Sequence, residues 1–252
     1  MTGAQPHPSS GLYGKLPARA DFLVRRLSRS FTEPWDRWLQ ASIVASREAL
    51  GNSWLDYYLN APIWRFALAP NSCGPASVAG VLVPSVDAVN RHFPLTIAIV
   101  LPHMTSAVEL TAYGGPWFRE SEECALACLD PQLRLEDLEA RLDALAWPAQ
   151  PTSISESAGE TPVKQTVDWM RCSISEAVVD EDLAGTVCHG ILDAMLQSRF
   201  DRYSVWWTAG SRHVAPAFTI SRELPSPARF TTFLLDAETE GAGFSETEGH
   251  EP

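Results

Sequence analysis

The sequence lacks the features that mark membrane-spanning and exported proteins. Its 252 residues contain no apolar run that approaches the roughly 18 residues of a membrane-spanning helix. The first ten residues, MTGAQPHPSS, have neither the basic segment nor the apolar core of a secretory signal. We therefore expect a cytoplasmic protein that does not insert into a membrane.

Lysine is nearly absent, and basic residues as a group are outnumbered. Only Lys15 and Lys164 occur, and 31 acidic residues face 19 basic ones, which gives a formal net charge of −12. Proteins that bind DNA or RNA need cationic side chains for the phosphates, so we expect no nucleic-acid partner. Lysine and arginine gather in residues 11–47, whereas residues 236–252 carry six acids and no lysine or arginine. The first stretch is either an ordinary mixed surface or a face that docks an acidic partner.

The five cysteines do not have the spacing of a metal site or of a disulfide framework. They stand at positions 73, 124, 128, 172 and 188. Cys124 and Cys128 are one helical turn apart, but no second pair supplies the four ligands of structural zinc, so we expect no metal. Cys73 could act as a nucleophile if His92 or His103 lay beside it. Nothing around Cys73 resembles a known nucleophile motif, so a cysteine in an ordinary turn is the favoured interpretation.

The stretch GLYGKLP, residues 11–17, resembles a phosphate-binding loop only superficially. Such a loop needs four residues between its glycines and a serine or threonine after the lysine. Here two residues separate Gly11 from Gly14, a leucine follows Lys15, and Pro17 has no backbone N–H to offer. We therefore predict no nucleotide and no cofactor. Gly14 instead indicates a bulge or a close backbone approach within a strand.

Strand-like and helix-like patterns alternate along the chain. We expect strands at residues 11–16, 21–26, 62–69, 76–84, 94–102, 203–210 and 215–221. We expect helices at residues 30–51, 53–60, 116–129, 134–145, 182–200 and 226–236. The apolar middle strands indicate a sheet covered on both faces, and the hairpin-length connections indicate antiparallel neighbours. The sequence predicts an α/β fold, a three-layer α/β/α sandwich around a mixed, largely antiparallel central sheet.

The helix at residues 30–51 has the clearest boundaries. Thr32 is a suitable N-cap, Pro34 suits the first turn, and Gly51 suits the position just past the end. Its tryptophans and leucines fall near one stripe, which predicts a helix that packs through two indole rings.

Three stretches in a fixed order resemble the TagF family, also called ImpM, of accessory proteins of bacterial type VI secretion systems. They read GLYGKLPARADFLVRRLSRSFTEPWDRWLQ, WLDYYLNAPIWRFALAP and CGPASVAGVLVPSVDAVNRHFPLTIA, within residues 11–102. In addition, SVWWTAG at residues 204–210 is similar to a tryptophan-rich element late in the family. Ala20 and Asn90 stand where the family usually has glycine. Asparagine tolerates a left-handed backbone, but a left-handed turn at Ala20 would be strained.

The resemblance and the composition divide the chain into five parts. We expect a leader at residues 1–10, a TagF-like α/β domain at 11–147, and a linker or exposed loop at 148–165. A C-terminal helix and strand subdomain, packed on the first domain, follows at residues 166–236, and an acidic tail at 237–252 ends the sequence. The leader and the tail are polar, so we expect both to be disordered.

The resemblance also implies a function. Members of the family have no known catalytic activity, so it implies a protein that is not an enzyme and has no small-molecule substrate. It implies post-translational repression of the secretion system through binding of the forkhead-associated scaffold protein, Fha. Two alternatives stay open: an assembly adaptor that contacts another secretion component, and a small cysteine hydrolase that uses Cys73.

Two groups of residues are candidates for roles in binding or folding. Arginine and tryptophan are common interface anchors, so we look for partner contacts among the exposed members of the first group. The first group is Lys15, Arg19, Arg25, Arg26, Trp206 and Trp207. For the tryptophans, core packing is the alternative. The second group is Asp21, Arg65 and Arg91, which flank apolar runs where an unpaired charge is costly. We predict that Asp21 pairs with one of these arginines and holds the first hairpin on the sheet; the alternative is a ligand cleft.

Overall fold

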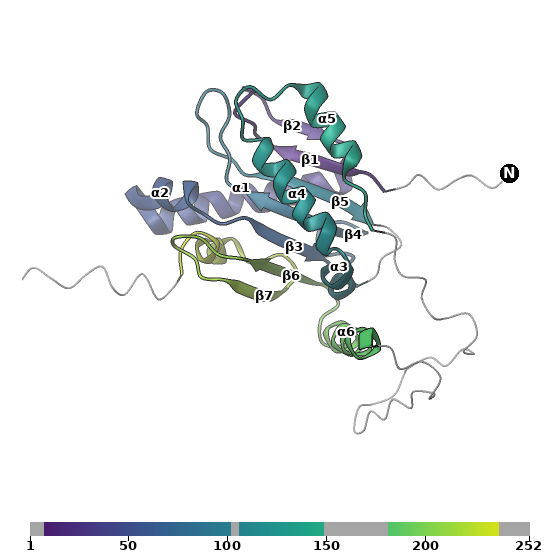
Figure 1. The fold of residues 1–252 in the computed structure, drawn as a ribbon. Coiled ribbons are helices and arrows are strands. Elements are labelled where there is room, and N and C mark those ends of the chain that lie inside the picture. The colour runs from purple at the N-terminus through teal and green to yellow at the C-terminus, as the bar shows by residue number, and fades with distance from the viewer. Residues whose placement is uncertain (1–7, 102–105, 149–180, 237–252) are drawn as a thin grey trace, which may run out of the picture.

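The computed structural model describes residues 8–101, 106–148 and 181–236. Among them, seven strands form one open sheet in the order β2-β1-β5-β4-β3-β6-β7 (Figure 1). The strands are β1 (Ser10–Gly14), β2 (Leu23–Arg25), β3 (Trp64–Leu68), β4 (Ser77–Val83), β5 (Leu95–Leu101), β6 (Tyr203–Thr208) and β7 (Ala217–Arg222). Every strand pair is antiparallel, so the expected mixed sheet is corrected to an entirely antiparallel one.

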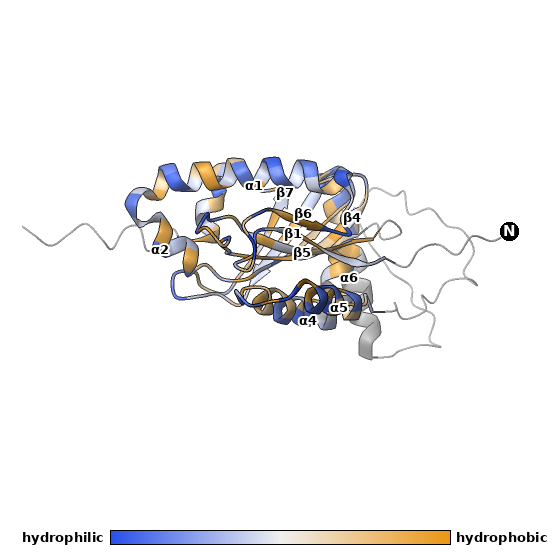
Figure 2. Ribbon diagram, turned by 90° about the horizontal axis from the view of Figure 1, so that it is seen from above, coloured by the Kyte–Doolittle hydropathy of each residue, from blue (hydrophilic) through white to orange (hydrophobic). Residues whose placement is uncertain are grey.

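The helices lie on both faces of this sheet. They are α1 (Arg29–Leu50), α2 (Trp54–Leu59), α3 (Ala107–Tyr113), α4 (Gly115–Ala127), α5 (Leu135–Ala144) and α6 (Glu181–Arg199). Two 3₁₀ segments are η1 (Gly51–Ser53) and η2 (Pro227–Phe233). Helix α1 runs along one face, and α4 and α5 lie against the other (Figure 2). Of these helices, only α3 was not expected from the sequence.

Helix α1 ends where the sequence predicts but begins earlier. Gly51 follows its last residue, as expected, and its N–H donates to the Arg47 carbonyl. The N-cap position is Ser28, however, and not Thr32, because the N–H groups of Phe31 and Thr32 already donate to the Ser28 carbonyl. Pro34 therefore lies inside the helix. Its missing N–H leaves one carbonyl of the first turn without a helical donor.

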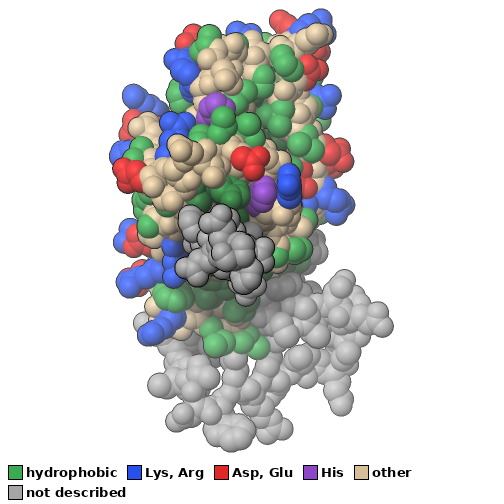
Figure 3. All heavy atoms as spheres, turned by 90° about the vertical axis from the view of Figure 1, so that its left-hand side faces the viewer, with side chains coloured by type: hydrophobic (Ala, Val, Ile, Leu, Met, Phe, Trp, Pro, Cys, Tyr) green, Lys and Arg blue, Asp and Glu red, His purple; other side chains and the backbone are tan. Residues whose placement is uncertain are grey.

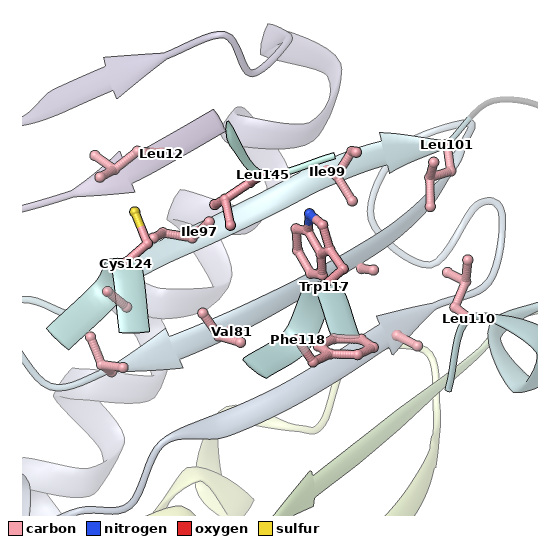
Figure 4. Close-up of a cluster of buried hydrophobic side chains, with 14 of the residues drawn as sticks. Leu12, Val81, Ile97, Ile99, Leu101, Leu110, Trp117, Phe118, Cys124 and Leu145 are labelled. Carbon is pink, nitrogen blue, oxygen red and sulfur yellow. The ribbon is translucent and has the colours of Figure 1, made fainter. Parts of the chain in front are cut away.

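The hydrophobic core is divided by the sheet into two clusters. On the α4 face, Trp117 and Phe118 lie over the central strands, with Ile97, Ile99 and Leu12 around them (Figure 4). Apolar side chains pack on both faces of β4 and β5, which explains why these strands read as continuous hydrophobic runs.

On the α1 face, aromatic rings dominate the cluster. Trp35 stacks on Trp206 with ring centroids 6.1 Å apart. The Phe66 ring centroid lies 4.7 Å from that of Trp35 and 5.1 Å from that of Trp206. Each indole has a polar partner: Trp35 Nε1 donates to Thr96 Oγ1, and Trp206 Nε1 donates to Ser204 Oγ, both at 2.9 Å. Trp206 is fully buried, so it belongs to the core and is not a surface anchor.

The C-terminal strands belong to the same sheet as the rest of the chain. Strand β6 pairs with β3, and β7 pairs with β6. The strands of the expected subdomain at residues 166–236 therefore extend the sheet of the first domain. Most of the expected linker at 148–165, the tail at 237–252 and residues 1–7 lie outside the described residues. No helix in the described part of the chain is long and apolar enough to cross a membrane.

Candidate partner-binding surface

The GLYGKLP stretch forms β1 and the turn after it. Gly14 has φ 136°, and a Cβ atom there would lie 2.3 Å from the carbonyl oxygen of Pro94. The predicted close backbone approach at Gly14 is thus confirmed, and the neighbouring backbone is that of Pro94 and Leu95 at the start of β5. Lys15 turns inward after this point, and its Nζ lies 2.8 Å from Asp87 Oδ2. Lys15 is only 6% exposed, so its side chain offers a partner little surface to contact.

Asp87 organises the loop between β4 and β5. Its carboxylate is fully buried and accepts hydrogen bonds from Lys15 Nζ and from Arg91 Nε at 2.6 Å. The backbone N–H groups of Val89 and Arg91 donate to its other oxygen, at 3.0 and 2.8 Å. Burial by itself would raise the pKa of Asp87, but the hydrogen bonds from Lys15 and Arg91 outweigh it and hold the pKa well below its usual range.

The same loop is bound to the turn between β1 and β2. The N–H of Ala88 donates to the Arg19 carbonyl at 2.9 Å, and Arg91 Nη2 donates to the Ala20 carbonyl. Asn90 has φ 64°, so the expected left-handed residue is present there. Ala20 is not among the residues with positive φ, so its departure from the family pattern causes no strain. Two segments far apart in sequence thus form one rigid corner.

This corner exposes apolar side chains beside two arginines. Phe22, Val24 and Val89 are 46, 42 and 59% exposed, and Arg19 and Arg91 are also exposed. These five residues are called the corner surface below. Large apolar groups that a rigid backbone holds in water are typical of protein-binding sites.

Phe22 is held in place within the corner surface. Its ring meets Phe93 edge to face with centroids 4.7 Å apart, and the Lys15 ammonium lies 5.1 Å from its ring centroid. The side of the ring that these contacts leave free faces solvent, and Phe22 is 46% exposed. A partner that buries this side loses little conformational entropy in the process.

Two other predicted basic residues, Arg25 and Arg26, form ion pairs within the fold. Arg25 Nε lies 3.0 Å from Glu139, and Arg26 contacts both Glu139 and Asp143 at 2.7 and 2.5 Å. These ion pairs join β2 to α5. Figure 3 views the molecule from the α2 side, where acidic and basic side chains are interspersed rather than gathered by sign. Trp207 is partly buried, with its ring centroid 4.7 Å from that of Phe118.

The predicted pairing of Asp21 is wrong. Arg65 instead forms a two-pronged ion pair with Glu122 of α4, at 2.6 and 2.7 Å, and Arg91 pairs with Asp87. Asp21 is exposed and forms no ion pair with any residue that the structure describes. Helix α4 packs on β4 and β5, and β3 lies beside β4 in the sheet, so Glu122 comes within reach of Arg65.

Sequence reasoning therefore missed the two acids that hold these arginines. Glu122 gives no signal of its own, because it lies in a run of acidic residues on α4. For Asp87 a signal exists in the pattern DAVN between two apolar runs, since aspartate before a left-handed asparagine is typical of a side-chain-stabilised turn.

Three cysteines, Cys73, Cys124 and Cys128, are buried in the core. Cys73 is 3% exposed, burial raises its pKa to about 12, and its Sγ lies 3.8 Å from the Phe31 carbonyl. His92 packs edge-on against Trp54 and Tyr58, and His103 lies outside the described residues. Within the described parts of the chain, no three potential ligand side chains gather into a metal site.

Comparison with known proteins assigns the chain to a family. The family profile of the TagF N-terminal domain, type VI secretion system-associated, matches residues 11–145. The crystal structure of PA0076 from Pseudomonas aeruginosa PAO1 has a similar fold, with a TM-score of 0.70 and 34% sequence identity. The alignment covers 97% of this chain and 99% of that one. No curated protein sequence matches significantly. The chain therefore belongs to the TagF family of type VI secretion system-associated proteins.

Proposed function

We propose that this protein is a non-enzymatic, cytoplasmic regulator that represses a bacterial type VI secretion system after translation by binding its forkhead-associated scaffold, Fha. Membership of the TagF family carries this proposal. The corner surface is the proposed contact, because it combines exposed apolar groups with a backbone that the Lys15–Asp87 pair keeps rigid. Apolar side chains that are already held in place lose little conformational entropy when a partner buries them.

The hydrolase alternative finds no support in the surroundings of Cys73. A cysteine nucleophile needs a thiolate that is accessible to substrate, and hence a thiol with a lowered pKa. Cys73 is buried, and its pKa is raised to about 12. The contacts of this thiol are those of a structural cysteine.

Capture of Fha from cells that express both proteins tests the proposal. We expect Val89→Glu and Phe22→Ser to reduce capture by at least about tenfold, because each change removes an apolar anchor. Val44→Glu is the matched control, since Val44 is 55% exposed on α1 and does not belong to the corner surface. Repression of secretion should decrease in the same variants that lose capture.

Two outcomes would contradict the proposal. If the wild-type protein does not capture Fha from a cell that contains the whole system, the adaptor alternative replaces the Fha-binding one. If all three variants capture Fha as well as wild type does, binding occurs elsewhere and the corner surface is excluded.

A further inference from the structure

The two edges of the sheet differ in how they are protected. Strand β2 has three residues, is followed by Arg26 in a left-handed conformation, and is joined to α5 by ion pairs. Such features prevent other chains from pairing with an edge strand. Strand β7 has six residues and, in the described part of the chain, pairs only with β6. It therefore presents a long open edge (Figure 1).

The backbone of β7 offers free hydrogen-bonding groups at known positions. The Glu223 N–H donates to the Arg202 carbonyl at 3.3 Å, and these residues continue the β6–β7 register. Because antiparallel pairs alternate between bonded and non-bonded, residues 217, 219 and 221 direct their N–H and C=O groups toward β6. Phe218 and Ile220 direct theirs toward the open edge.

The side chains of the same two residues are apolar and exposed. Phe218 is 60% exposed and Ile220 is 37% exposed. They lie opposite Trp207 and Val205 of β6, on the face that α4 covers further along the sheet. An apolar row thus runs from the core to the open edge and ends there in water. Such an edge favours pairing with another strand.

We propose that the edge of β7 pairs with β7 of a second copy of this chain. The two strands run antiparallel about a two-fold axis at Thr219, so that Phe218 of each copy lies opposite Ile220 of the other. In this register the outward-directed groups of both copies face each other, and the ladder of hydrogen bonds continues across the axis. A shift by one residue would set outward groups against inward ones and lose these bonds.

The charges beside β7 favour a second copy over an unrelated strand. A groove of about 270 Å³ lies on the other face of the edge, between β7 and η2. Arg229 lines this groove from the first turn of η2, which the chain enters from the Ser221 end of β7, and it forms no ion pair with a described residue. Asp236 lies at the Ala217 end, where its Oδ2 accepts the Ala215 N–H at 2.6 Å. Two-fold pairing reverses one copy, so each Arg229 comes to the same end as the other copy's Asp236.

Engineered cysteines test this register in the full-length protein. Across the axis, the two Thr219 residues form a non-bonded pair with Cα atoms about 4.5 Å apart, within the range for a disulfide. We expect Thr219→Cys to give a disulfide-linked dimer under mild oxidation. Ala217→Cys is the matched control, because its partner across the axis is Ser221, and it should cross-link no more than wild type.

Sedimentation equilibrium tests the association without a covalent bond. We expect wild type to be a dimer, and Ile220→Glu to raise the dissociation constant by at least about tenfold, because it sets a charge within the apolar row. Arg229→Glu and Asp236→Lys should each weaken self-association, and their mixture should form a heterodimer. A monomeric wild type, a failure of Thr219→Cys to cross-link, or equal cross-linking of Ala217→Cys would each overturn the proposal.

Discussion

Replacing Gly14 with alanine tests whether the close approach of β1 to β5 sets the position of the corner. The new Cβ would lie 2.3 Å from the Pro94 carbonyl oxygen and 2.9 Å from the Leu95 Cα atom. Both are backbone atoms in the neighbouring chain, so no side-chain rotation relieves the clash. In addition, φ 136° is a conformation that residues with a side chain rarely adopt.

The two costs can be estimated separately. Backbone strain at such a position costs about 1–3 kcal/mol, and the forced separation of packed strands about 1–3 kcal/mol. The free energy of unfolding should therefore fall by about 2–6 kcal/mol. Gly51→Ala is the control, because Gly51 has φ 52° but no atom within 4 Å of its Cβ position. That change should cost only backbone strain, because φ 52° with ψ −129° is a conformation that residues with a side chain rarely adopt, and this cost is about 1–3 kcal/mol.

Urea denaturation, followed by tryptophan fluorescence, measures both variants on the same scale. Tryptophan fluorescence is a suitable probe because both core clusters contain buried tryptophans. If Gly14→Ala loses no more stability than Gly51→Ala, the contact between β1 and Pro94 is not a constraint. The account of the corner as a rigid platform would then be refuted.

Four further experiments have definite expected outcomes. The pKa of Asp87 is lowered in the folded protein, so the charged Asp87 stabilises the fold above about pH 4, and this contribution is lost as the pH falls from there toward the lowered pKa. The free energy of unfolding should therefore decrease more steeply with falling pH for wild type than for Asp87→Asn, as acid denaturation can measure. Cys73 should not react with iodoacetamide at pH 8 unless the protein is unfolded, as mass spectrometry can show. Glu122→Gln weakens the ion pair with Arg65 and should cost about 1–2 kcal/mol in urea denaturation. Phe118→Ala empties a fully buried site and should cost about 3–5 kcal/mol in the same assay.

The elements of this fold could be read from the sequence because their boundaries are chemical. Proline and glycine border the apolar runs that become β3, β4 and β5. The end of α1 was also predictable, since Gly51 takes the positive φ that ends a helix. The position of β5 between β1 and β4 was not predictable, because hydrophobic periodicity shows that a strand is covered but not which strand lies beside it.

Side-chain roles were harder to predict than the elements that carry them. Trp206 and Trp207 are adjacent, and strand alternation sends them to opposite faces. Because helices cover both faces here, alternation did not separate a buried ring from an exposed one. Lys15 looked like a surface residue because its partner, Asp87, lies 72 positions away. Only the folded chain brings this pair together.

The two proposed surfaces lie at opposite ends of the sheet, which makes them separable by experiment. The corner belongs to β1 and β2, and β7 is the last strand at the other end. A dimer through β7 leaves both corner surfaces free. Ile220→Glu should therefore still capture Fha in solution. Its retention should be weaker only on a support that carries several Fha copies, because the monomeric variant lacks the avidity of a dimer. Val89→Glu should still sediment as a dimer. If either variant lost both properties while it remained folded by circular dichroism, the two surfaces would not be independent, and the corner would have to take part in self-association.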